Sequence, residues 1–103
     1  MKEEYEKIKE LVSQINVLSC EFAILRDIIY TDCVKINGRI NEDYRCELYK
    51  GIANMTEEIN DLGKRRNKLL NELKDIPRAG EIMIEHRIFL EEIPPYIEPK
   101  WII

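Results

Sequence analysis

Two apolar ladders lie within residues 8–76, which read IKELVSQINVLSCEFAILRDIIYTDCVKI (8–36), NGRI (37–40) and NEDYRCELYKGIANMTEEINDLGKRRNKLLNELKDI (41–76). Taken at alternating steps of three and four residues, the first ladder consists of Ile8, Leu11, Ile15, Leu18, Phe22, Leu25, Ile29, Asp32 and Ile36. The second consists of Leu48, Ile52, Met55, Ile59, Leu62, Arg66, Leu69, Leu73 and Ile76. Only Asp32 and Arg66 are not apolar, so the 3.5-residue period predicts two helices, each with a continuous apolar seam.

The segment between the ladders, residues 37–40, is too short to place two helices parallel to each other. We therefore expect the helices to fold back as an antiparallel hairpin. Gly38 suits the left-handed conformation that ends a helix, and Asn41 suits the N-cap of the next one. Glu42 and Asp43 would stabilise the positive end of the second helix dipole.

An antiparallel register in which paired residue numbers add to 77 sets seam positions of the two helices opposite each other in every layer. It pairs Phe22 with Met55 and places Asp32 level with Arg45. Because a buried acid without a partner is costly, the arginine on the facing helix favours this register. The prediction is an ion pair between Asp32 and Arg45.

The first helix carries more apolar side chains than one partner helix covers. Beyond the ladder these are Val17, Cys20, Ala23, Ile24, Ile28 and Tyr30. A helix that is apolar over most of its circumference must be covered on more than one side. We expect the C-terminal segment or a second copy of the protein to cover Ile24 and Ile28.

The second helix contains Gly51 and Gly63, and each costs about 1 kcal/mol relative to alanine in a helix interior. The glycines are either tolerated weak points or a local kink. Alternatively, Gly51 admits the close approach of a third helix or a neighbouring chain.

Residues 79–93, which follow the helix stop at Pro77, fit two patterns. The helical pattern has apolar or aromatic side chains at Ala79, Ile82, His86, Phe89 and Ile93. The strand pattern alternates at Ile82, Ile84, His86, Ile88 and Leu90, and such a strand would have to pair with another molecule. The glutamates in this region and the stop at Pro94-Pro95 favour a short third helix, with His86 half-buried on it.

The chain ends in a proline-containing and strongly apolar stretch, IPPYIEPKWII, at residues 93–103. Prolines favour an extended chain, and disordered tails are normally polar. We therefore expect this tail to be docked, either on the uncovered face of the first helix or on a partner protein. The candidate partner-binding residues are Tyr96, Ile97, Trp101, Ile102, Ile103, Ile24 and Ile28.

Composition narrows the functions worth testing. The chain has 20 acidic and 16 basic residues and a net charge of -4, which opposes general binding to nucleic acids or anionic membranes. We expect a cytoplasmic protein, because no apolar run reaches membrane-spanning length and residues 1–5 lack the apolar core of a secretion signal. Cys20, Cys33 and Cys46 form no close pair, which indicates reduced thiols rather than a disulfide or a zinc site.

No residue pattern indicates catalysis, a metal site or a cofactor, because the chain has one histidine and no glycine-rich phosphate loop. The only basic cluster is KRRNK at residues 64–68. It is either a phosphate-contacting patch or a solvated helix face with Asp61–Arg65 and Lys68–Glu72 ion pairs, and the acidic whole favours the second. The candidate anion or ligand contacts are Arg45, Tyr49, Arg65, Arg66 and Lys68, of which Arg45 and Tyr49 would line a pocket between subunits together with Tyr44.

The predicted architecture is a single all-α domain. An antiparallel, coiled-coil-like helical hairpin occupies residues 1–76, with arms of about 50 Å. A short third helix and the docked extended tail occupy residues 77–103. We expect a homo-oligomer that acts as a non-enzymatic protein-binding module, such as an adaptor, regulator or inhibitor of the phage or mobile-element type, through a helical face and the tail. The alternative is an oligomeric small-molecule or nucleic-acid binder that uses basic and aromatic residues of the second helix.

Overall fold

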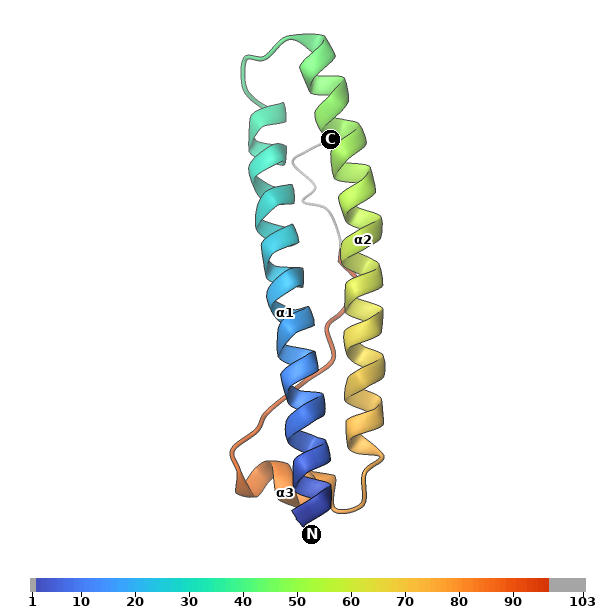
Figure 1. The fold of residues 1–103 in the computed structure, drawn as a ribbon. Coiled ribbons are helices and arrows are strands. Elements are labelled where there is room, and N and C mark those ends of the chain that lie inside the picture. Colours follow the sequence, from blue (N-terminus) through green and yellow to red (C-terminus); the bar gives the residue numbers. More distant parts are fainter. Residues whose placement is uncertain (1, 97–103) are drawn as a thin grey trace.

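The computed structural model describes residues 2–96, which form three helices: α1 (Lys2–Ile36), α2 (Glu42–Lys74) and α3 (Ala79–Glu85). The first two run antiparallel as a hairpin, and α3 lies at the end of the hairpin that holds the N-terminus (Figure 1). The molecule is a rod of 60 × 18 × 16 Å. The predicted all-α hairpin with a short third helix is confirmed. None of the helices within residues 2–96 has an apolar stretch long enough to cross a bilayer.

The two predicted ladders form the contact between α1 and α2. Every ladder residue is buried or half-buried, including Asp32 and Arg66. The largest fully buried side chains are Ile8, Ile15, Ile29, Ile36, Ile59, Leu70, Leu73 and Cys33. Leu70 is not a ladder residue. It is buried because α3 adds Ile82 and Met83 to the hydrophobic cluster at this end of the hairpin.

The register of the hairpin differs from the predicted one. Arg66 Nε donates a hydrogen bond to Ser19 Oγ at 2.8 Å, and a Cβ placed on Gly63 would lie 3.5 Å from the Phe22 ring. The residue numbers of both pairs add to 85, eight more than predicted, so the pairing is displaced by about one heptad. A heptad shift keeps both apolar ladders facing each other, which is why the period alone did not reveal it.

The predicted Asp32–Arg45 ion pair was wrong. Arg45 lies beyond the last turn of α1, where its guanidinium donates to the carbonyl of Ile36 and, at 3.3 Å, to that of Gly38. Because the last carbonyls of a helix lack intrahelical donors, Arg45 caps the C-terminus of α1. The Asp32 carboxylate lies 3.9 Å from Lys35 Nζ instead.

The turn between the long helices combines one confirmed prediction with one that was wrong. Asn41 is the N-cap of α2, and its Oδ1 accepts from the Tyr44 N–H at 2.8 Å. Gly38 does not adopt a left-handed conformation. Its N–H donates to the Lys35 carbonyl at 3.0 Å, and the guanidinium of Arg45 supplies the donors that a left-handed cap would have provided.

The third helix is shorter than the apolar stripe predicted, because Arg87 adopts a left-handed conformation with φ 57°. The Ile88 N–H donates to the Met83 carbonyl at 2.8 Å and the Arg87 N–H to the Ile84 carbonyl at 3.1 Å. These are the two hydrogen bonds of a Schellman cap, and they end α3 at Glu85.

His86 lies outside the helix and is exposed, rather than half-buried as predicted. Its ring stacks on that of Tyr5, with 4.1 Å between the centroids. The chain after Arg87 then turns back along the hairpin, which carries residues 91–96 to the site described below (Figure 1).

Replacing Arg45 with leucine should lower the free energy of unfolding by about 1 kcal/mol, because the carbonyls at the end of α1 lose charged donors. For a chain of this size the midpoint of thermal unfolding should fall by about 4–8 °C, measured by circular dichroism. Arg65→Leu is the matched control, because Arg65 is exposed and makes no ion pair within 4 Å in the described part of the chain. Equal melting of the two variants would contradict the capping role.

Gly51→Ala should raise the free energy of unfolding by about 0.5–1 kcal/mol, because alanine orders more readily in a helix interior. A Cβ at this position would meet no atom within 4 Å, so nothing in the described structure opposes the change. Urea unfolding followed by circular dichroism measures the difference. A lower midpoint would mean that a second chain packs against Gly51 in solution.

Candidate functional site

The densest set of polar contacts between separate segments lies where residues 91–96 pass over the groove between α1 and α2 (Figure 1). These residues are called the tail segment below. The residues that hold it or lie beneath it form the tail groove, which consists of Ser19, Phe22, Asn60, Gly63, Arg66 and Asn67.

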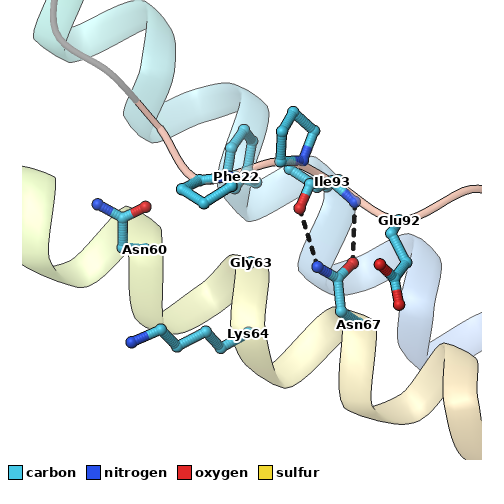
Figure 2. Close-up of a pocket in the computed structure, with 9 residues that line it drawn as sticks. Phe22, Asn60, Gly63, Lys64, Asn67, Glu92 and Ile93 are labelled. Carbon is cyan, nitrogen blue, oxygen red and sulfur yellow. Dashed lines mark hydrogen bonds between the residues drawn. The ribbon is translucent and has the colours of Figure 1, made fainter.

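Asn67 binds the main chain of Ile93 with both ends of its side-chain amide. Its Nδ2 donates to the Ile93 carbonyl at 2.9 Å, and its Oδ1 accepts from the Ile93 N–H at 2.9 Å (Figure 2). A residue of a neighbouring antiparallel strand makes the same two-bond ring in a hydrogen-bonded pair. Asn67 thus replaces a strand partner and contacts only main-chain atoms of Ile93 through these bonds.

Asn60 makes one main-chain contact of this kind three residues further along the tail segment. Its Oδ1 accepts from the Tyr96 N–H at 2.8 Å. Its Nδ2 donates to the Thr56 carbonyl at 3.0 Å, which fixes the orientation of the amide. The two asparagines lie seven residues apart on α2, so they share one face of the helix.

The spacing of the asparagines is close to the length of three extended residues. Seven helical residues rise about 10.5 Å, and three residues of polyproline II helix span about 9 Å. Ile93 and Pro94 each precede a proline and are restricted to extended conformations, while Pro94 and Pro95 have no N–H. Within residues 93–96 the two N–H groups that remain are those of Ile93 and Tyr96, and α2 binds both.

Arg66 links the tail segment to both long helices. Its Nε donates to Ser19 Oγ at 2.8 Å and its Nη1 to the Glu91 carbonyl at 2.7 Å. The Ser19 hydroxyl in turn donates to the Ile15 carbonyl at 2.8 Å. Arg66 is only 7 % exposed, and this burial lowers the pKa of its guanidinium below the ordinary value. No carboxylate of residues 2–96 lies within 4 Å of it, so its hydrogen-bond partners in this part of the chain are neutral oxygen atoms.

The groove is wider than the segment that lies in it. A hollow of about 380 Å³ opens between the tail segment and α2, lined there by Asn60, Gly63, Lys64 and Asn67. A second hollow of about 450 Å³ opens toward α1, lined there by Ser19, Ala23 and Arg26. Phe22 lines both hollows, close to Ile93 (Figure 2).

The apolar contacts of the tail segment are limited. Ile93 and Tyr96 are half-buried and pack against the hydrophobic cluster that contains Phe22 and Ile59. The other four residues of the segment, Glu91, Glu92, Pro94 and Pro95, are exposed. The main-chain hydrogen bonds therefore have a large share in fixing where the segment lies.

Of the predicted partner-binding residues, Tyr96, Ile24 and Ile28 lie in the described part of the chain. Tyr96 belongs to the tail segment, whereas Ile24 and Ile28 are 59 % and 43 % exposed. Arg26 lines the hollow beside the tail segment, and helical geometry puts both isoleucines on the opposite side of α1. The tail segment therefore does not cover Ile24 and Ile28, although a cover by the C-terminal segment was one of the two expectations. The remaining predicted residues lie outside the described part of the chain, namely Ile97, Trp101, Ile102 and Ile103.

The predicted ligand contacts are also separated. Arg66 is buried in the tail groove, and Arg45 is engaged at the end of α1. Tyr44 and Tyr49 are exposed near that end. Arg65 and Lys68 are exposed too, and the ion pairs predicted for them with Asp61 and Glu72 are not formed within 4 Å.

Sequence reasoning did not single out Asn60, Asn67 or Ser19, which the structure places in the candidate site. The one available signal was the repeat of asparagine, a poor helix former, at a seven-residue spacing on α2. No disulfide joins Cys20, Cys33 and Cys46 to one another. Within residues 2–96 no cluster of histidine, cysteine and acidic side chains could hold a metal ion.

No family model, curated protein or solved structure matched the chain when compared with it. Function is therefore inferred from the tail groove itself.

Asn67→Ala should loosen the tail segment and leave the hairpin intact, because the Ile93 main chain loses both partners. The Ile93 main-chain amide should then exchange with deuterium about tenfold faster or more, as expected when the opening free energy of the segment falls by roughly 1.4 kcal/mol. The Ile59 amide in the core should be unaffected, and nuclear magnetic resonance follows both. Asn54→Ala, at an exposed asparagine of α2, is the control. An unchanged Ile93 rate in Asn67→Ala would show that these bonds do not hold the segment.

Proposed function

We propose that the protein is a non-enzymatic protein-binding module whose binding element is the tail groove. The observation that carries the proposal is the pair of side-chain amides on α2 that bind the main chain of a separate segment. Side chains that bind main-chain donors and acceptors recognise polypeptide as such, because these groups are common to every residue. This is the chemistry of peptide recognition.

The rigidity of the platform supports the same proposal. Asn60 and Asn67 lie on a long helix that is packed into the core through Ile59 and Leu62. Side chains on packed helices are held more firmly in place than side chains on loops. A second bond fixes the Asn60 amide before any ligand arrives. The groove is thus prepared for an extended chain.

The alternative, binding of an anion or a nucleic acid, would need the basic cluster to be accessible, and its central residue is not. Arg66 lies in the middle of the basic cluster, yet it is buried and donates to Ser19 and Glu91. The exposed bases that remain are Lys64, Arg65 and Lys68. Protein binding therefore agrees better with the way the cluster is used.

Self-association is a second part of the proposal. Val17, Ile24 and Ile28 are 56 %, 59 % and 43 % exposed and lie on one stripe of α1. A second copy that covers this stripe would remove apolar surface from water. Sedimentation of the purified chain tests this part, and a monomer at micromolar concentration would reject it.

Affinity purification of the full chain from its native cell tests the protein-binding role. The wild type and Asn54→Ala should retain the same partner protein. A chain carrying both Asn60→Ala and Asn67→Ala should retain about tenfold less, because the main-chain bonds are lost. Circular dichroism should show equal helix content in all three chains. Equal retention by the double variant, or no partner with any chain, would contradict the proposal.

A further inference from the structure

The donors and acceptors of the tail groove restrict the kind of peptide that it accepts, an inference that rests on the proposed function. α2 offers side-chain oxygen acceptors to the tail segment at two points, Asn67 Oδ1 and Asn60 Oδ1. An extended segment of four ordinary residues would bring four N–H groups to these two acceptors. Prolines at the two middle positions remove the surplus donors, so the groove matches a segment with a central Pro-Pro.

The flanking positions of the segment must be apolar. In polyproline II helix, which Pro94 and Pro95 favour, residues three apart such as Ile93 and Tyr96 lie on the same side of the segment. Both are half-buried against the cluster that contains Phe22, while Pro94 and Pro95 between them are exposed. The pattern that fits the groove is therefore aliphatic-Pro-Pro-aromatic.

The present occupant can be replaced without loss of the groove. The four hydrogen bonds that α2 makes with the tail segment all end on main-chain N–H or carbonyl groups. Any chain of the same backbone geometry can make them. The hollows on both sides of the segment leave room for an incoming chain to begin contact with Phe22.

We propose that the tail groove binds an aliphatic-Pro-Pro-aromatic segment of a partner protein in polyproline II conformation, and that residues 93–96 occupy the groove as a tethered competitor. The tether keeps the competitor at an effective concentration in the millimolar range. The partner segment must therefore displace it, which makes binding conditional on release of the tail segment.

The test uses a fluorescein-labelled peptide with the sequence of residues 90–97, LEEIPPYI, and the full chain. In the full chain, Pro94→Gly together with Pro95→Gly loosens the tethered segment, because glycine is not restricted to extended conformations. Fluorescence anisotropy should show the peptide binding this variant about tenfold more tightly than the wild type, or more. Equal affinity for the two chains would overturn the proposal.

Two controls fix the place and the chemistry of binding. Adding Asn67→Leu to the glycine variant should weaken peptide binding about tenfold or more, whereas adding Asn54→Leu should not. A peptide in which both prolines are replaced by alanine should bind about tenfold more weakly. Equal binding of the proline and alanine peptides would overturn the proposed ligand class.

A second measurement serves if the glycine variant fails to fold. Millimolar proline peptide added to the wild type should displace the tail segment, and the Ile93 amide of the protein should lose its protection from exchange. Protection that persists at saturating peptide would count against displacement. If the peptide converts a wild-type dimer into monomers, the natural occupant is the segment of a second copy, and the partner proposal is overturned.

The outcomes separate this inference from the proposed function. Asn67-dependent retention of a partner protein without peptide binding would reject the polyproline ligand and keep the protein-binding role. If the chain retains no partner protein and binds no peptide, the polyproline ligand and the protein-binding role are both rejected.

Discussion

The antiparallel contact between the two apolar ladders is the constraint on which the rest of the structure depends. Each aliphatic side chain that it buries stabilises the fold by about 1.5–3 kcal/mol, whereas one hydrogen bond of the tail groove contributes about 1 kcal/mol net. The ladders therefore decide that a hairpin forms. The weaker polar contacts then decide where a segment lies on it. Because the hairpin is straight and its seam continuous, residues seven apart on α2, such as Asn60 and Asn67, present the same face to a chain that runs alongside.

The register of the hairpin determines the chemistry of the tail groove. The one-heptad displacement that separates Asp32 from Arg45 also brings Arg66 level with Ser19 on the facing helix. A guanidinium at the edge of an apolar seam is costly to bury unless its N–H groups find acceptors. Ser19 supplies one and the Glu91 carbonyl supplies another. The tail segment thus supplies one of the acceptors that Arg66 needs. The burial of this arginine in the second ladder and the docking of the tail segment therefore depend on each other.

Local patterns predicted the parts of the structure that local physics decides. The heptad period predicted both long helices and their buried faces. Asn41 predicted the start of α2, and Pro77 predicted that the helix ends before it. The register was not predictable from the period, because ladders displaced by a whole heptad bury the same residues. The end of α3 was missed because Arg87 takes the left-handed position where glycine is the usual signal. Asn67 and Ile93 were missed because two asparagines seven residues apart on a helix do not indicate which distant main chain they bind, here one 26 residues away.

The order of the tail segment depends on its prolines more than on the number of its hydrogen bonds. Fixing the backbone of one ordinary residue costs about 1–2 kcal/mol, which is comparable to the net gain from one hydrogen bond. Four hydrogen bonds alone, at about 4 kcal/mol, would therefore not offset the roughly 4–12 kcal/mol needed to order a flexible segment of four to six residues. Pro94 and Pro95 have fixed φ angles and restrict the residues before them, so much of the ordering is complete before docking. A groove with few donors and acceptors can then hold a stiff chain that it could not hold if the chain were flexible. Under the proposed function, the stiffness that the two prolines give to a segment is what the tail groove would select for first.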